Sequence, residues 1–180
     1  LPTSEQFATL WAQRTGCRFQ VTRRERTFEL RSVIPPLPLP GLLRPAAETD
    51  LPLLAEWTRA FSIEALHEDL SPEDALEMTA TRIEDRLLFV WDAGGAVSMA
   101  ATTRPTIHGI TVSLVYTPSR QRGRGYASNC VAALSQRMLD EGYQFCTLFT
   151  DLANPISNHI YQQIGYRPIA DFNEYHFEND

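Results

Sequence analysis

The residues best suited to chemistry lie in one stretch, residues 115–128, with the sequence VYTPSRQRGRGYAS. A β-branched run ends at Thr117, a polar loop follows, and Gly123 and Gly125 lead into a segment with helical periodicity. Glycine at these two places lets the backbone turn tightly and lets successive N–H groups face a ligand. The start of the helix adds about half a positive charge. The stretch therefore predicts a phosphate or pyrophosphate site, with an ordinary glycine-rich turn as the alternative.

Two common nucleotide-binding patterns do not fit this loop. A dinucleotide-binding fingerprint needs a third glycine or an alanine where Ser128 stands, and an acidic residue at the end of a second strand. A Walker A loop needs a lysine, and all 16 basic residues of the chain are arginine. Three of them (Arg120, Arg122 and Arg124) lie in the loop and can strengthen anion binding by charge-assisted hydrogen bonds.

A second stretch, residues 154–166, has the sequence NPISNHIYQQIGY. Asn154 before Pro155 is a good helix cap, and isoleucines at helical spacing surround Tyr161. The phenol of Tyr161 could donate a proton in a reaction, or its ring could simply pack at the edge of the core.

Taken together, the two stretches resemble the GCN5-related N-acetyltransferases, the GNAT superfamily. Residues 122–127 read as the family's R-x-x-G-x-A signature, and residues 154–166 resemble its N-x-x-A-x-x-x-Y-x-x-x-G-[FY] motif, with Ser157 in place of the alanine. The similarity covers about residues 42–180. It implies a mixed α+β fold, in which helices flank a mostly antiparallel sheet and two splayed parallel strands form the acetyl-CoA cleft.

The resemblance also implies a reaction, the transfer of the acetyl group of acetyl-CoA to a primary amine in a ternary complex. The acceptor would be a small molecule or a peptide amine, and no metal is expected. Backbone groups of Val115, Tyr116 and Thr117 would bind pantetheine, and an N–H near Val115 would hold the oxyanion. Tyr161 would protonate the departing thiolate and Asn154 would contact the cofactor. The pyrophosphate would be wrapped by Gln121, Arg122, Gly123, Arg124, Gly125, Tyr126 and Ala127.

The general base stays open, because the predicted strand at 110–117 carries no acidic residue. Candidates elsewhere are Glu64, His67, Glu68, Asp69, His108 and Glu174. The acidic stretch at 64–77 could attract a cationic amine, or its acids could simply favour a helix N-terminus.

The elements that must position these residues follow from periodicity and turn signals. We expect a strand at 42–46, helices beginning near Asp50 and after Ser71, and three strands at 87–91, 96–103 and 110–117. A helix should follow the loop, then a strand at 145–152, the helix after Asn154, and strands at 166–170 and 174–177. Within residues 1–40 we expect a helix, a hairpin at 18–33 and a proline-rich linker. We expect residues 41–180 to form one domain.

Composition limits the classes of function. The 180 residues carry a formal net charge of −6, which argues against a nucleic-acid partner. No apolar run is long enough to span a membrane. Three distant cysteines without metal-ligand spacing indicate reduced thiols in a cytoplasmic protein.

Two alternatives to the enzyme remain at this point. One is a CoA-binding sensor or degenerate module without turnover, favoured by the missing base. Another is an RNA-binding module that uses the arginines of residues 18–31 and 120–124. Pairing of two copies into a homodimer through the terminal strands is also open.

Overall fold

The computed structural model describes residues 4–178, which form one seven-stranded mixed sheet in the order β2-β3-β4-β5-β6-β1-β7. Every neighbouring pair of strands is antiparallel except β5 and β6, which are parallel. The strands are β1 (Arg18–Leu30), β2 (Leu42–Pro45), β3 (Leu88–Asp92), β4 (Ala96–Thr103), β5 (Gly109–Tyr116), β6 (Phe145–Asp151) and β7 (Arg167–Glu178). The expected fold class is confirmed.

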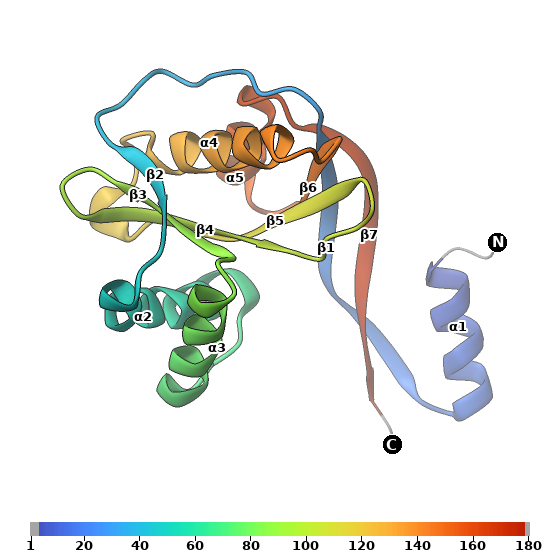
Figure 1. Cartoon of the computed structure of the whole chain (residues 1–180). Coiled ribbons are helices and arrows are strands. Elements are labelled where there is room, and N and C mark those ends of the chain that lie inside the picture. Colours follow the sequence, from blue (N-terminus) through green and yellow to red (C-terminus); the bar gives the residue numbers. More distant parts are fainter. Residues whose placement is uncertain (1–3, 179–180) are drawn as a thin grey trace.

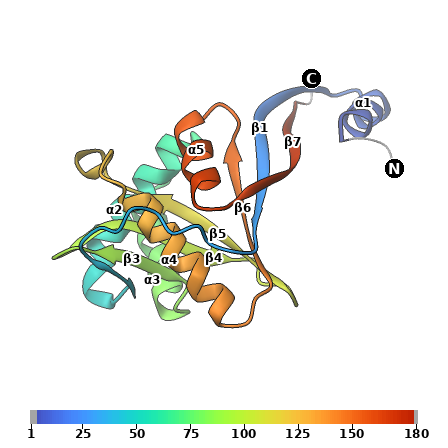
Figure 2. The ribbon, with the colours of Figure 1, turned by 90° about the horizontal axis from the view of Figure 1, so that it is seen from above.

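Helices cover both faces of this sheet (Figures 1 and 2). One face carries α4 (Tyr126–Asp140) and α5 (Pro155–Gln163), and the other carries α2 (Leu51–Phe61) and α3 (Pro72–Glu84). A further helix, α1 (Ser4–Thr15), lies apart from these four. Short turns complete the chain: η1 (Glu48–Asp50), the π-helical η2 (Ser62–Leu66) that extends α2, and η3 (Ser119–Gln121).

Each face of the sheet has its own apolar core. Under α4 and α5, buried Val131, Leu134 and Met138 meet strand residues such as Leu148. This is the helical face that the spacing of apolar residues predicts for residues 127–138. Under α2, Leu54, Trp57 and Met99 pack with Tyr116 of β5. The two cores hold β5 from both sides, and β5 is the strand that leads into the glycine loop.

The order of elements after residue 41 follows the sequence prediction, but both ends of the chain differ from it. The hairpin expected at 18–33 is wrong, because β1 is one continuous strand. It pairs with β6 through residues 25–30 and with β7 through residues 18–29. The two short strands expected at 166–170 and 174–177 are likewise one strand, β7. Pairing with partners more than 100 residues away keeps β1 and β7 extended, and local pattern does not reveal such partners.

The proline-rich segment 31–41 crosses over α4 and connects β1 to β2 (Figure 2). Asn129 of α4 donates to the carbonyl of Leu37 at 3.1 Å, and Trp91 Nε1 donates to the carbonyl of Pro40 at 3.2 Å. Hydrogen bonds therefore hold the linker against α4 and β3. A domain boundary at residue 40 stays a prediction, but the segment before it supplies β1, a strand inside the sheet.

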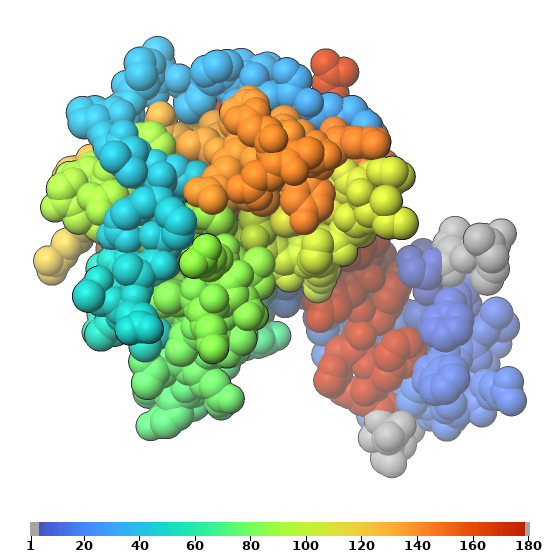
Figure 3. Space-filling view, in the orientation of Figure 1, coloured from blue at the N-terminus to red at the C-terminus, as the bar shows by residue number. Residues whose placement is uncertain are grey.

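The part of β1 before residue 25 pairs only with β7. This two-stranded ribbon curves away from the sheet (Figure 1). α1 packs at its end. The space-filling view shows a notch between the ribbon and the lobe of α2, η2 and α3 (Figure 3).

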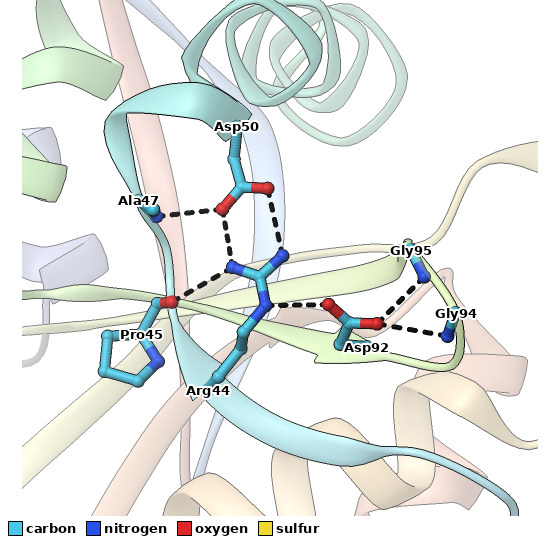
Figure 4. A network of polar contacts seen from close by, with 7 residues as sticks. All are labelled: Arg44, Pro45, Ala47, Asp50, Asp92, Gly94 and Gly95. Atoms are coloured by element: carbon cyan, nitrogen blue, oxygen red, sulfur yellow. Dashed lines mark hydrogen bonds and ion pairs between the residues drawn. The ribbon is translucent and has the colours of Figure 1, made fainter.

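A polar network ties β2 to the start of α2 and to the turn after β3 (Figure 4). Arg44 donates to both carboxylate oxygens of Asp50, at 2.6 and 3.0 Å, and to Asp92 Oδ2 at 2.7 Å. Asp50 also accepts from the N–H of Ala47 at 2.8 Å. Hydrogen bonds from Arg44 lower the pKa of both carboxyl groups. The sequence predicts Asp50 as a helix cap, but its side chain caps nothing in α2 and serves this network.

All three cysteines are buried and free, as expected for interior thiols. Burial raises the pKa of Cys130 and of Cys146 to about 12, so neither is a reactive thiolate. Within residues 4–178, no helix is long and apolar enough to cross a membrane.

Candidate active site

The two parallel strands separate at the centre of the sheet. β5 pairs with β6 only at three positions, from Gly109 opposite Phe145 to Thr111 opposite Thr147, where the two hydroxyls are 2.9 Å apart. Beyond this point Leu114 has a φ of 49°, and the register between β4 and β5 shifts. A left-handed residue in a strand marks a bulge that bends it away from its neighbour. The splayed strands expected from the resemblance are present.

Val115, Tyr116 and Thr117 follow this bulge at the end of β5. Val115 is half-buried, whereas Tyr116 and Thr117 are buried. The Ser98 hydroxyl of β4 donates to the Tyr116 carbonyl at 3.2 Å and lies 2.9 Å from Thr117 Oγ1. The bulge and these bonds hold in place the backbone that is predicted to meet pantetheine.

The glycine loop follows, and its backbone has the conformation that the sequence predicts. Gly123 and Gly125 have φ values of 74° and 82°, a region that other residues rarely adopt. Gly125 is the residue before α4, and no side chain caps this helix. The first N–H groups of α4 are thus available to an anion. Gln121 in the same loop has a buried Oε1 without a hydrogen-bond partner among the described residues.

Arg122 connects this loop to Glu64 on the opposite side of the sheet. Arg122 Nη2 lies 2.5 Å from Glu64 Oε2, and Arg122 Nε donates to the carbonyl of Thr117 at 2.8 Å. The hydroxyl of Tyr116 donates to Glu64 Oε1 at 3.0 Å. Burial is the main cause that raises the pKa of Tyr116, and the hydrogen bond to Glu64 is the second cause. The exposed side chains of Arg120 and Arg124 lack such contacts among residues 4–178.

Tyr161 of α5 is almost fully buried, with 8% of its surface exposed. Its ring lies between Phe28 of β1 and Tyr166, with centroids 6.5 and 6.1 Å away. Burial raises the pKa of Tyr161 to about 12, so its hydroxyl stays protonated at ordinary pH. Sequence reasoning missed Phe28, because only the sheet order brings β1 beside β6 and α5.

Asn154 and Asn158 start α5. The side-chain oxygen of Asn154 accepts from the N–H of Ser157 at 3.1 Å, so the expected helix cap is present. A contact between Asn154 and a cofactor stays a prediction. Asn158 donates to the carbonyls of Asp151 and Asn154, at 3.0 and 2.7 Å, while its own side-chain oxygen is buried without a partner in the described part of the chain.

The remaining candidates for the general base separate into groups. Asp69 is paired with Arg59 at 3.0 Å, and His108 contacts Gln144 beside the far end of β5. His67, Glu68 and Glu174 instead line one cavity of about 410 Å³ between η2 and the ribbon of β1 and β7. The structure thus brings Glu64 to the end of β5 and three other candidates to a common cavity. Within residues 4–178, no group of histidine, cysteine, aspartate and glutamate could hold a metal ion.

Comparisons with known proteins give one family match and several solved structures with a similar fold. Residues 94–176, which include both motifs, match the family described as FR47-like protein. A GNAT-family acetyltransferase from Colwellia psychrerythraea has a TM-score of 0.68 at 14% identity, over 99% of this chain and 63% of its own. A GCN5-related N-acetyltransferase from Sphaerobacter thermophilus has a TM-score of 0.70 at 18% identity, over 97% and 56%.

A third solved structure, a putative acetyltransferase from Salmonella typhimurium with its cofactor acetyl-CoA, has a TM-score of 0.57 at 15% identity, over 69% of this chain and 78% of its own. At these identities the likeness shows the fold. The chain spans only 63% and 56% of the first two proteins described. A search of curated proteins finds no match.

Proposed function

We propose that the chain belongs to the GNAT superfamily and that it moves the acetyl group of acetyl-CoA directly to a primary amine. The observation that carries the proposal is the opening between β5 and β6, which lies directly before the glycine loop and its uncapped helix. A strand edge with unpaired backbone groups suits the amides of pantetheine. The helix start suits the pyrophosphate.

In this proposal the loop residues 121–127 hold the pyrophosphate through backbone N–H groups. Gly123 and Gly125 supply the left-handed turns that point these groups outward. The backbone of Val115, Tyr116 and Thr117 binds the pantetheine arm. A backbone N–H near Val115 then lies beside the thioester carbonyl, where it stabilises the oxyanion that forms on attack.

The transfer itself needs two proton movements. The neutral amine attacks the carbonyl carbon, the C–N bond forms, and the C–S bond breaks as the tetrahedral intermediate collapses. Tyr161 donates its proton to the departing thiolate sulfur, which supports leaving-group departure. The nitrogen loses a proton to a base, and Glu64 is the candidate that lies at the end of β5. No acyl-enzyme is involved.

The test begins with calorimetric titration of acetyl-CoA into the protein, with NADH and ATP as controls. We expect micromolar binding of acetyl-CoA alone, and loss of that binding in Gly125→Glu. A panel of primary amines then tests acetyl transfer, followed as release of free CoA thiol. A folded protein that binds none of the three nucleotides would refute the proposal.

A second function, CoA binding without turnover, is favoured by one observation. The carboxylate of Glu64 is already engaged by Arg122 and by the hydroxyl of Tyr116, so it is not free to accept a proton in this arrangement. Binding of acetyl-CoA without acetylation of any amine in the panel would support this function instead.

A further inference from the structure

The proline-rich linker (residues 31–41) touches both stretches of the proposed site, and Figure 2 shows it crossing α4 between them. At its start, the N–H of Ile34 donates to the carbonyl of Ile164 at 2.9 Å, directly after α5. A Cβ on Gly165 would lie 2.6 Å from the carbonyl oxygen of Ser32. The linker therefore passes directly over the end of the helix that carries the proposed general acid.

The other end of the linker packs on the residue before α4. A Cβ on Gly125 would lie 3.2 Å from Leu39 Cδ1, so the leucine side chain covers the face of this glycine on which a side chain would stand. Two residues earlier in the linker, the carbonyl of Leu37 accepts from Asn129 Nδ2 at 3.1 Å. The linker thus connects the end of α5 with the glycine loop and the start of α4.

The linker is stiff and is held at both ends. Four of residues 35–40 are proline: Pro35, Pro36, Pro38 and Pro40. Proline fixes φ, and segments rich in proline stay extended and act as semi-rigid spacers. The bond from Ile34 holds one end, and the bond from Trp91 Nε1 to the carbonyl of Pro40 holds the other. A stiff segment fixed in this way can support Leu39 against the loop.

Asn129 extends this support to the peptide between Gly125 and Tyr126. Its buried amide nitrogen donates one hydrogen to the Leu37 carbonyl and the other to the Gly125 carbonyl, each at 3.1 Å. The backbone N–H of Asn129 donates to the same Gly125 carbonyl at 3.1 Å. These bonds direct that carbonyl into the helix. In a planar trans peptide the N–H of Tyr126 then points the opposite way, out of the start of α4.

We infer that Leu39 and Asn129 are positioning residues for the cofactor, through which the linker holds the N–H of Tyr126 towards the pyrophosphate. The inference rests on the proposed function. Both residues act through the backbone of the loop and need no contact with the cofactor. A loop that is already ordered binds more tightly, because less conformational entropy is lost on binding. The linker lies outside residues 94–176, so this support comes from outside the segment that matches the family model.

Two ligands separate this role from a general effect on the fold. CoA carries the pyrophosphate, whereas pantetheine is the same arm without it. CoA is titrated by calorimetry, and pantetheine by NMR, which measures millimolar affinities. In Leu39→Ala we expect the affinity for CoA to fall about fivefold and the affinity for pantetheine to stay unchanged. Leu39→Met keeps most of the side-chain contact and should restore the affinity for CoA.

Leu37→Ala is the matched control on the same linker. The substitution removes a side chain that is 86% exposed and keeps the carbonyl that Asn129 binds, so the affinity for CoA should not change. Asn129→Leu has a similar size and no charge, but no hydrogen to donate. We expect it to weaken CoA about fivefold and to leave pantetheine unchanged. Circular dichroism establishes that each variant is folded at the temperature of the titrations.

The outcomes distinguish this inference from the proposed function. An unchanged affinity for CoA in Leu39→Ala and Asn129→Leu would overturn the inference. Equal losses for CoA and pantetheine would also overturn it, because they would indicate a general effect on the fold. Binding is measured without turnover. CoA binding that responds to the variants as expected, without acetyl transfer to any amine, would support the inference and refute the proposed transfer alone.

Discussion

The ring of Phe28 packs on the ring of Tyr161, with centroids 6.5 Å apart and planes inclined by 60°. The two residues are far apart in the chain and meet because β1 lies between β6 and β7. Phe28 is fully buried, so it forms a fixed wall on one side of the tyrosine. The N-terminal strand therefore helps to position the proposed general acid, although it carries neither family motif.

Tyr161→Phe tests the general acid. The variant keeps the ring and its packing on Phe28 and removes only the hydroxyl, so we expect kcat to fall about a hundredfold while the KM for acetyl-CoA stays nearly constant. Steady-state kinetics with any accepted amine measure both. An unchanged kcat would exclude Tyr161 as the acid.

The pH profile gives a second check on Tyr161. Because burial raises the pKa of Tyr161 to about 12, the hydroxyl remains protonated well above the usual pKa of a phenol, near 10. We expect kcat of the wild-type protein to show no alkaline decline from this group below about pH 11. A decline near pH 10 that disappears in Tyr161→Phe would show that the phenol is more exposed to water than the structure indicates.

Phe28→Leu tests whether β1 positions the tyrosine. The smaller side chain leaves a gap beside Tyr161 at a cost of about 1 to 2 kcal/mol in the free energy of unfolding. We expect kcat to fall severalfold, with acetyl-CoA binding unchanged by calorimetry. Phe19→Leu on the same strand is the control, because Phe19 contacts Tyr175 and Phe177 instead. Equal losses of kcat in both variants would indicate a general effect on stability.

Gly125→Ala tests the loop. The left-handed φ of 82° strains any side chain, and the new Cβ would lie 3.2 Å from Leu39 Cδ1 and 3.9 Å from Asn129 Nδ2. We expect acetyl-CoA affinity to fall about tenfold, since the strain and the close contact displace the N–H groups at the start of α4. Gly123→Ala has a similar φ of 74° but no atom within 4 Å of its Cβ, and should have a smaller effect. A larger loss of acetyl-CoA affinity in Gly123→Ala than in Gly125→Ala would contradict this geometry.

Glu64→Gln tests the contact between the loop and the acceptor side. Loss of the ion pair frees Arg122, so its guanidinium no longer has to leave a carboxylate before it can turn to the pyrophosphate. We expect acetyl-CoA to bind about two- to fivefold more tightly. Glu68→Gln is the matched control, because Glu68 does not contact Arg122 and should leave this affinity unchanged. Weaker binding in Glu64→Gln would mean that the ion pair holds the loop in its binding conformation.

Asp50→Asn tests the network around Arg44. The hydrogen bonds from Arg44 lower the pKa of Asp50 in the folded protein, so the stabilisation is complete above the unfolded value, near pH 4. It is lost as the pH falls through the lowered, folded pKa. We expect Asp50→Asn to reduce the free energy of unfolding at pH 7 by about 1 to 2 kcal/mol. The difference from wild type, measured by urea denaturation, should shrink below pH 4, and a difference that does not depend on pH would refute the electrostatic explanation.

Local sequence patterns were enough to predict the glycine loop, the helix after it, the cap at Asn154 and the order of elements after residue 41. These features depend on groups close together in the chain. A left-handed turn needs glycine at its own position, and a buried helix face needs apolar residues three and four apart. The motif at 154–166 placed Tyr161 on a helix for the same reason.

The position of β1, and with it the contact between Phe28 and Tyr161, depends on the pairing of distant strands. An arginine-rich strand such as residues 18–30 does not reveal its partners, because backbone pairing with β6 and β7 uses the same N–H and C=O groups in any sequence. The ion pair of Glu64 with Arg122 and the cavity beside Glu68 depend on the same packing of distant segments. Local sequence thus supplied the groups proposed to bind the donor, whereas the packing of distant segments decided what faces the acceptor.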